Sequence, residues 1–169
     1  AMNVNDLVCV GAEPLAMLDY LAVQQTDAEV FDQIGKGLAA GAEMANISIP
    51  GGEVSQMKEI IRGVNEGEGV DLVGAAVGLV DLDGLVVGEG IEDGDVVVGL
   101  LSNGLHSNGF TLARRVLFGE LGLDPGDHVH EFGHSAAEEL LRPTAIYVKP
   151  AVAMMRAGLQ VRAFSHMTS

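Results

Sequence analysis

Residues 102–110 read Ser-Asn-Gly-Leu-His-Ser-Asn-Gly-Phe, and this stretch separates two segments with different patterns. The run before it, residues 95–101, is apolar and rich in Val, which is typical of a strand. Residues 111–117 follow it with the spacing of a helix. This order of strand, glycine-rich loop and helix indicates an α/β fold. Its loop can hold phosphate, because Gly permits close approach of the backbone and the N–H groups at a helix start attract anions. An ordinary βα turn is the alternative.

The composition is that of a chain that folds around a hydrophobic core. The 169 residues are 48% hydrophobic, which suits one domain or two small ones and excludes a disordered chain. No apolar run reads as a membrane span, and the first residues lack the pattern of a secretory leader. A single cysteine, Cys9, excludes an internal disulfide. We therefore expect a cytoplasmic protein.

The charge balance is strongly acidic. Asp and Glu number 24 against 9 Lys and Arg, which gives a net charge of −15. Such a surface repels nucleic acid and anionic membranes, so we expect neither as a partner. It also repels itself, and molar salt shortens the screening length to about 3 Å and removes most of that penalty. A salt-loving host is one hypothesis, and a mesophilic protein with an acidic tract is the alternative.

The hydrophobic spacing predicts alternating strands and helices. Strands are expected over 15–23, 46–49, 70–81, 96–101 and 161–164, and a helix is the alternative for the first of these. Helices are expected from a cap at Thr26 or Asp27 through residue 45, and over 110–121, 135–141 and 149–157, with Ser135 as a cap before Glu138. A loop is expected over 57–69 and a hairpin-type turn at 82–85. The acidic, glycine-rich stretch 88–94 is the best boundary between two lobes, 1–92 and 93–169.

Two upstream motifs carry candidate ligands. Asn5 and Asp6 stand at the head of a short helix-like run, where a carboxylate can ligate Mg²⁺ or can cap the helix. Gly51 and Gly52 precede Glu53, so the backbone can approach a ligand while the Glu reaches a cation. A tight turn with a solvated Glu is the alternative for this second motif.

Several further polar residues invite a functional reading. His106 can donate to phosphate or act as acid or base, and a loop histidine bonded to the backbone is the alternative. Asn108 can bind a polar ligand or adopt a left-handed turn. Arg114 and Arg115 can face phosphate, or can be solvated or paired. Asp19 lies amid apolar residues and must be paired or functional. The histidines at 128, 130 and 134 have spacing that fits no zinc motif.

Taken together, these motifs resemble the phosphoribosylformylglycinamidine cyclo-ligase family, also called aminoimidazole ribonucleotide synthetases. With the acidic composition, we expect a member of this family from a halophilic archaeon. The resemblance covers nearly the whole chain, and the string at 104–109 is its most specific part. It rests on six strings that occur in order: Met-Asn-Val-Asn-Asp-Leu-Val (2–8), Gly-Ala-Glu-Pro-Leu (11–15), Leu-Asp-Tyr (18–20), Gly-Gly-Glu (51–53), Asp-Leu-Val-Gly-Ala-Ala-Val-Gly (71–78) and Gly-Leu-His-Ser-Asn-Gly-Phe (104–110).

The resemblance implies a reaction and a fold. The reaction is ATP-dependent closure of formylglycinamidine ribonucleotide to aminoimidazole ribonucleotide in purine biosynthesis, with ADP and phosphate released. The fold is α/β (α+β) with two domains, both partial here, and the first contributes to a β-barrel across a homodimer. Residues 1–92 are then the later part of an ATP-binding domain, and 93–169 the first part of a second domain.

The resemblance also implies site residues and the cofactors ATP and Mg²⁺. Asp6 and Glu53 would hold the metal, and His106 and Asn108 would be catalytic. Six further residues would bind the nucleotide: Asn5, Gly51, Gly52, Gly104, Ser107 and Gly109. The partner is a small-molecule substrate.

The chain departs from the family pattern in three places. The family's Thr-Ala-Glu-Met-Pro after Gly-Gly-Glu is Val-Ser-Gln-Met-Lys here (54–58), which removes a second acidic position. The family's N-terminal glycine-rich segment with its lysine is absent. So is the Gly-Gly-Gly after a His-Ile-Thr string, of which residues 166–168 look like the start. We therefore expect both ends to be cut from a longer polypeptide and this piece alone to be inactive.

Two other classes of function stay open. Related kinases such as thiamine-monophosphate kinase, and selenophosphate synthetase, share the Asn-Asp and Gly-Gly-acid motifs. Release of ADP with formylglycinamidine ribonucleotide rather than thiamine monophosphate separates the first two readings. A non-catalytic ATP-binding or interaction domain is the third, and it gains weight if Asp6→Asn leaves nucleotide affinity unchanged.

Overall fold

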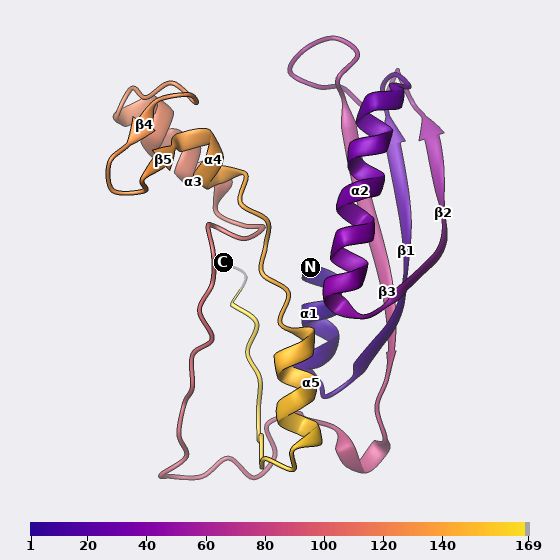
Figure 1. Ribbon diagram of the computed structural model, residues 1–169, viewed down its shortest axis with the longest axis vertical. Coiled ribbons are helices and arrows are strands. Elements are labelled where there is room, and N and C mark those ends of the chain that lie inside the picture. The colour runs from indigo at the N-terminus through magenta and orange to yellow at the C-terminus, as the bar shows by residue number, and fades with distance from the viewer. Residues whose placement is uncertain (168–169) are drawn as a thin grey trace. The chain divides into compact units, whose positions relative to one another are not determined.

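The computed structural model describes residues 1–167, so Thr168, which belongs to the string at 166–168, and Ser169 lie outside the described residues. The chain forms two compact units (Figure 1). Unit 1 contains Asn3–Ile91 and Ile146–Phe164, and unit 2 contains Glu92–Ala145. The division into domains 1–92 and 93–169 stays a prediction, since compact units and domain boundaries need not coincide.

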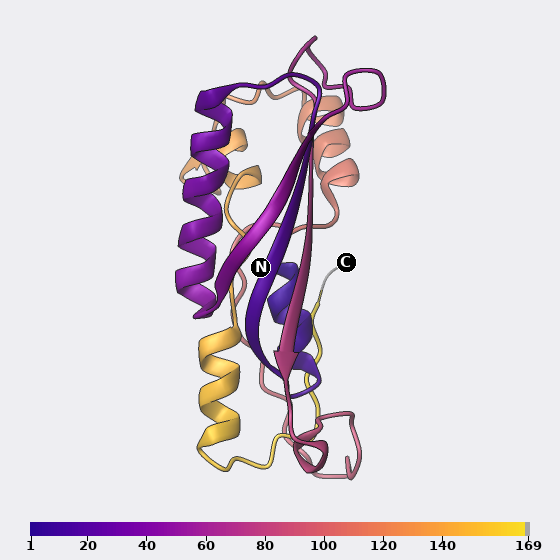
Figure 2. The ribbon, with the colours of Figure 1, turned by 90° about the vertical axis from the view of Figure 1, so that its right-hand side faces the viewer.

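A three-stranded sheet forms the frame of unit 1, with strand order β2-β1-β3 (Figure 2). The strands are β1 (Glu13–Val23), β2 (Ser48–Gln56) and β3 (Val70–Leu79). β1 pairs in parallel with β2 and antiparallel with β3. The predicted strands at 15–23 and 70–81 are confirmed to within two residues at either end.

Helix α2 (Ala28–Ala45) connects β1 to β2, as parallel pairing requires. Its N-cap is Asp27, whose Oδ1 accepts hydrogen bonds from the backbone N of Glu29 at 2.8 Å and of Val30 at 3.2 Å. It ends at Asn46, which adopts the left-handed conformation with φ 56°. The predicted helix is confirmed, and Asp27 rather than Thr26 is the cap.

The core of unit 1 forms where α1 (Met2–Cys9) and α5 (Val148–Arg156) pack together. Val4 and Val8 of α1 contact three buried residues of α5, and Ala45 and the partly buried Ala76 of β3 join them. The α5 contribution is Val148, Ala151 and Val152. The helix predicted at 149–157 is thus confirmed, and its apolar face closes the core.

Strand alternation divides the sheet into two unlike faces. Gly74 and Ala76 of β3 turn toward α1, and the Nδ2 of Asn3 donates to the Gly74 carbonyl oxygen at 2.7 Å. The opposite face carries Leu18 and Val73, whose side chains are exposed by 54% and 52%. Tyr20 and Val77 are also exposed on this strand pair. We call this the outer face of the sheet.

Unit 2 contains short elements. Helix α3 (Phe110–Arg114) continues into η2 (Arg115–Glu120), which is π-helical, and α4 (Ala136–Leu140) follows the two-residue strands β4 (His128–Val129) and β5 (His134–Ser135). Ser135 and Glu138 form a capping box at the start of α4, as predicted. The helix predicted over 110–121 is confirmed in position, and its hydrogen bonding changes from α-helical to π-helical at Arg115.

Two predicted strands are wrong. Residues 96–101 form no strand, and Val97 and Leu101 are 96% and 93% exposed. A strand needs a neighbour to pair its backbone, and within residues 1–167 neither sheet includes this run. Residues 161–164 also belong to neither sheet, although the Gly88 backbone N donates to the Arg162 carbonyl oxygen at 3.1 Å.

Two predicted turns also differ. The short strand at 46–49 was expected to end at Pro50-Gly51-Gly52, but β2 runs through them to Gln56. β2 lies at an edge of the sheet, where the missing N–H of Pro50 is tolerated. Residues 82–85 form the 3₁₀ turn η1 (Leu82–Gly84) and not a hairpin, because no strand follows to pair with β3.

Candidate functional site

The glycine-rich loop of unit 2 has an unusual backbone. Gly104, His106 and Gly109 all have positive φ, at 60°, 58° and 82°. His106 is the notable case, because a left-handed conformation is uncommon for a residue with a side chain and costs on the order of 1–3 kcal/mol. Strain of this kind is concentrated at functional sites. The loop therefore holds His106 in a conformation that the chain does not prefer by itself.

The loop borders a hollow of about 520 Å³ within unit 2. Arg115 lines it from η2, and its Nε lies 3.2 Å from Oε1 of Glu120. The other lining residues belong to the loop and to α3: Ser107, Asn108, Gly109, Phe110, Thr111 and Leu112. Hydroxyl, amide and guanidinium groups suit a polar, anionic ligand. Of the two predicted arginines, Arg115 thus both faces the hollow and is paired with an acid.

The segment after α4 holds the loop. The Nδ2 of Asn103 donates to the Pro143 carbonyl oxygen at 2.7 Å. Oγ of Ser107 and Oγ1 of Thr144 lie 3.1 Å apart, and either can donate. Sequence reasoning missed this segment, because it lies about 40 residues further along the chain and carries no motif of its own.

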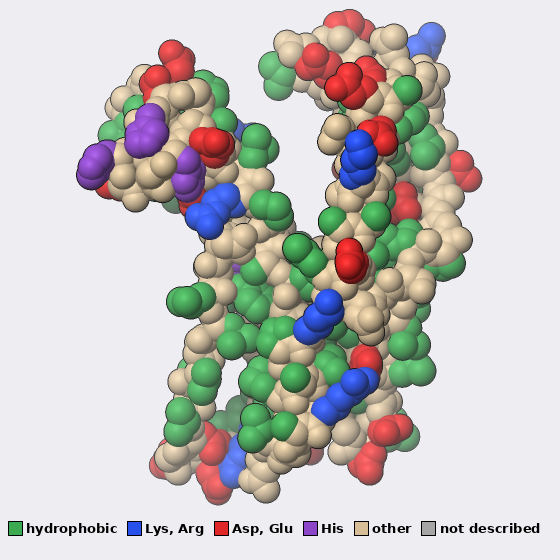
Figure 3. Space-filling model, viewed as in Figure 1, with side chains coloured by type: hydrophobic (Ala, Val, Ile, Leu, Met, Phe, Trp, Pro, Cys, Tyr) green, Lys and Arg blue, Asp and Glu red, His purple; other side chains and the backbone are tan. Residues whose placement is uncertain are grey.

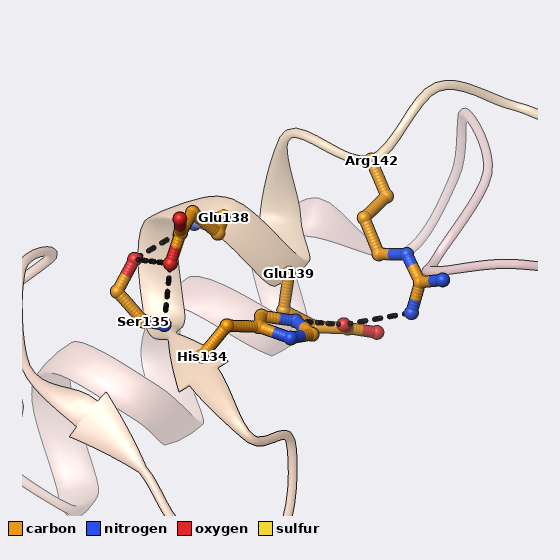
Figure 4. Close-up of polar contacts among 5 residues, drawn as sticks. All are labelled: His134, Ser135, Glu138, Glu139 and Arg142. Carbon is orange, nitrogen blue, oxygen red and sulfur yellow. Dashed lines mark hydrogen bonds and ion pairs between the residues drawn. The ribbon is translucent and has the colours of Figure 1, made fainter.

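A polar network surrounds α4 (Figure 4). Nε2 of His134 lies 2.6 Å from Oε2 of Glu139, and NH1 of Arg142 reaches the same oxygen at 3.3 Å. These partners, His134 first, hold the pKa of the Glu139 carboxyl below its usual range. Hydrogen bonds from Ser135 do the same for the pKa of Glu138. The network holds α4 through side chains that precede it, lie within it and follow it.

Three histidines of unit 2, His128, His130 and His134, lie in or beside β4 and β5, and Figure 3 shows histidine side chains close together in this part of unit 2. His134 takes part in the α4 network through Glu139. Among residues 1–167, no group of three or more His, Cys, Asp or Glu side chains is arranged to hold a metal ion.

Asn5 and Asp6 lie inside α1 and not at its start. The N-cap of α1 is Ala1, so the alternative reading of Asp6 as a helix cap is wrong. Asn5 is 1% exposed, and its Oδ1 accepts a hydrogen bond from the backbone N of Tyr147 at 2.9 Å. That oxygen joins α1 to the start of α5. Asp6, the next residue, is exposed.

Gly51, Gly52 and Glu53 lie in the extended strand β2, so the alternative of a tight turn is wrong. Gly52 is opposite Asp19 of β1, and a Cβ added to Gly52 would lie 2.5 Å from Oδ1 of Asp19. Glycine is thus required where the backbone meets this carboxylate, and Asp19 itself is half-buried. The expectation that Asp19 is paired or functional stays a prediction.

The structure does not bring Asp6 and Glu53 together. Glu53 is opposite Tyr20, and therefore on the outer face of the sheet, where its Oε1 accepts from the Val54 backbone N at 3.2 Å. α1, which carries Asp6, packs on the other face. The loop residues Gly104, His106, Ser107, Asn108 and Gly109 lie in unit 2. The last three line the hollow, and Gly104 and His106 are not among its lining residues.

The comparisons with known proteins define the class first. Residues 1–80 match the family AIR synthase related protein, N-terminal domain, and residues 92–169 match its C-terminal domain. The chain thus belongs to the AIR synthase related proteins. Two solved structures share the fold: thiamine monophosphate kinase from Aquifex aeolicus, and hydrogenase maturation protein HypE. Their TM-scores are 0.56 and 0.54 at 20% and 15% identity, over 92% and 90% of this chain and 45% and 41% of theirs.

Within this class, the chain is similar to phosphoribosylformylglycinamidine cyclo-ligases. It is 48% identical over 168 residues to the cyclo-ligase of Methanothermobacter thermautotrophicus, and 47% identical over 169 residues to that of Methanocaldococcus jannaschii. These alignments cover 99% of this chain and 48% and 46% of the two relatives. The chain spans about half the length of the curated relatives it matches.

Within residues 1–167, none of the helices has the length and apolar character that crossing a bilayer needs.

Proposed function

We propose that the protein that carries this chain converts formylglycinamidine ribonucleotide into aminoimidazole ribonucleotide with ATP, releasing ADP and phosphate, in purine biosynthesis. The observation that carries the proposal is the 48% identity to a named cyclo-ligase over nearly the whole chain. The strained loop at His106 and the adjoining hollow support it, because the hydroxyl, amide and guanidinium groups that line the hollow suit a phosphorylated substrate.

The loop residues have distinct roles in this proposal. His106 and Asn108 act at the reacting end of the substrate, His106 by moving a proton to or from the nitrogen that closes the ring. Ser107 and the backbone around Gly104 and Gly109 bind phosphate oxygens. Precise placement of these groups supplies much of the rate enhancement, since ring closure needs one nitrogen held against one activated carbon.

Mg²⁺ in this proposal neutralises the charge of the triphosphate. Asp6 and Glu53 do not fit a shared ion, because they lie on opposite faces of the sheet. Mg²⁺ binds proteins through one or two carboxylates and completes its shell with phosphates and water. Asp6 alone, exposed on α1, suits that pattern. Gly51 and Gly52 shape β2, and Asn5 shapes α1, and in this proposal both elements bind the nucleotide.

A related ATP-dependent kinase is the second candidate. One specific observation favours it: the fold is shared with AaThiL, solved in complex with AMPPCP and TMP, at a TM-score of 0.56 over 92% of this chain. That likeness is at 16% identity, against 48% for the cyclo-ligase. The cyclo-ligase therefore remains the better supported reading.

We also propose that the protein is a cytoplasmic homodimer whose sheets meet through the outer face, in the barrel that the family resemblance implies. Exposed apolar side chains on this face support the proposal: Leu18, Tyr20, Val73 and Val77. Such a face favours burial against a second copy. Leu18→Glu should then convert a dimer into a monomer in sedimentation equilibrium. A chain that is monomeric before the substitution contradicts the dimer.

A halophilic host is proposed from the net charge of −15. Acidic side chains also spread over much of the face shown in Figure 3. The chain should unfold at a higher temperature in molar KCl than in dilute buffer, because salt screens its self-repulsion. Equal unfolding temperatures would remove this hypothesis.

The activity is best tested in a chimera, since the chain spans about half of its relatives. The chain replaces the matching part of the Methanothermobacter cyclo-ligase. ADP release is then followed with formylglycinamidine ribonucleotide and, separately, with thiamine monophosphate. Release with the first substrate alone supports the cyclo-ligase. Release with the second moves the protein to the kinase branch, and failure of nucleotide binding favours a non-catalytic domain.

A further inference from the structure

We propose that the segment 139–144 is a clamp that fixes the glycine-rich loop, and that Thr144 is a positioning residue which orients the Ser107 hydroxyl for ligand binding. This inference rests on the proposed function and extends it to residues outside the family motif. We call residues 139–144 the α4 clamp. It contacts the loop at three places, through two hydrogen bonds and one steric contact.

The first contact fixes the start of the loop. The Nδ2 of Asn103 donates to the carbonyl oxygen of Pro143 at 2.7 Å, which is a short and well-formed bond. Proline has no N–H, so this carbonyl is the only backbone hydrogen-bonding group that Pro143 can offer. Asn103 therefore binds to the rigid residue of the clamp.

The second contact is steric and lies under Gly104. A Cβ at Gly104 would be 3.0 Å from Cβ of Arg142 and 3.3 Å from the carbonyl oxygen of Glu139. With φ 60°, Gly104 also has a backbone conformation that side chains disfavour. The loop thus lies directly against the end of α4, and a larger residue here would lift it away.

The third contact sets a hydrogen-bond direction. Ser107 Oγ and Thr144 Oγ1 are 3.1 Å apart, and Ser107 also lines the hollow. A hydroxyl has one hydrogen and two lone pairs. When Thr144 donates to Ser107, the Ser107 hydrogen is left to point at an anionic ligand. Thr144 therefore prepares Ser107 as a donor, while itself lying outside the set of residues that line the hollow.

The clamp is itself held at both ends of α4. The capping box of Ser135 and Glu138 closes the N-terminal turn, with bonds of 2.8 and 3.2 Å. His134 and Arg142 both reach Oε2 of Glu139 (Figure 4). A helix of five residues is marginal without such support. The network therefore serves to keep the clamp, and with it the loop, in place.

The test compares Thr144→Val, Thr144→Ser and, as a matched control, Thr26→Val at an exposed threonine of unit 1. Backbone ¹⁵N order parameters are measured for residues 103–109 in the 169-residue chain. Thr144→Val, nearly equal in shape, should lower the values from a rigid level near 0.85 to below about 0.6. Thr144→Ser and Thr26→Val should retain the wild-type values. A loop that stays rigid in Thr144→Val overturns the clamp.

The same variants in the chimera test the positioning role. Thr144→Val should lower kcat/KM for the ribonucleotide by about ten-fold, the usual effect of one hydrogen bond, with an unchanged unfolding temperature. Thr144→Ser should restore it. An unchanged kcat/KM, or a loss that Ser does not restore, contradicts the role of Thr144. An inactive wild-type chimera argues against the proposed function and leaves the order parameters to decide the clamp.

Discussion

The sheet of unit 1 and the glycine-rich loop of unit 2 owe their conformations to different kinds of force. The sheet is held by two backbone ladders, each with one register shift, and by the apolar cluster of α1 and α5. The loop is held by a few polar contacts with the α4 clamp and by glycines at positive φ. Changes in the sheet should therefore alter the free energy of unfolding, while changes in the loop should alter function at little cost in stability.

The largest expected effect comes from Gly52 of the sheet. In Gly52→Ala, the new Cβ would lie 2.5 Å from Oδ1 and 2.6 Å from the carbonyl oxygen of Asp19, and a paired backbone oxygen cannot move away. We expect a loss of about 3 kcal/mol in the free energy of unfolding, measured in urea. Gly51→Ala is the matched control, because nothing lies within 4 Å of its added Cβ. Equal effects of the two would contradict the register of β2.

The next effect comes from the loop and should fall on activity. His106 has φ 58°, which glycine adopts without strain, so His106→Gly should leave the free energy of unfolding unchanged or slightly raised. Loss of the imidazole should lower kcat of the chimera about a hundred-fold, the lower end of the range for acid–base catalysis. A large fall in stability would show that the loop is part of the structural frame after all.

The smallest effect is a difference in acid sensitivity between the two units. Glu138 and Glu139 have lowered pKa values in the folded chain, chiefly from Ser135 and His134 respectively. The unfolded chain then binds more protons as the pH falls below the usual glutamate pKa of about 4.3, so acid destabilises α4.

NMR signals of residues 134–144 should therefore weaken before those of β1 as the pH is lowered from about 6 to about 3. Glu138→Gln with Glu139→Gln should remove the sensitivity to pH, although α4 is then weaker throughout. Simultaneous loss of signals from both units would show that the network around α4 does not govern its stability.

The same contrast explains what the sequence could predict. α2 and β1 were predictable because their spacing repeats over many residues and Asp27 marks the helix start. β2 was not, since Gly-Gly after Pro reads as a turn and only pairing with β1 keeps it extended. The strand expected at 96–101 failed for the opposite reason: Val favours strands, but a strand exists only with a partner.

The candidate site was predictable in part. The glycines and His106 stand out in the sequence, because their pattern differs from that of the strand and helix around them. Thr144 does not, since its bond to Ser107 joins residues 37 apart in the chain. The face on which Glu53 lies depends on the pairing of Glu53 with Tyr20, and a sequence does not reveal that register. Local sequence patterns identify residues of the types that bind ligands. Tertiary contacts decide which of these residues lie close together.

The most direct test of the account is to detect aminoimidazole ribonucleotide itself. The chimera is supplied with Mg²⁺-ATP and formylglycinamidine ribonucleotide in concentrated KCl, beside the same chimera with Asp6→Asn. We predict product from the first protein and at least about a hundred-fold less from the second, because Asp6 is the carboxylate assigned to Mg²⁺-ATP. A folded chimera that binds ATP but forms no product would contradict the assignment of this chain to the cyclo-ligases.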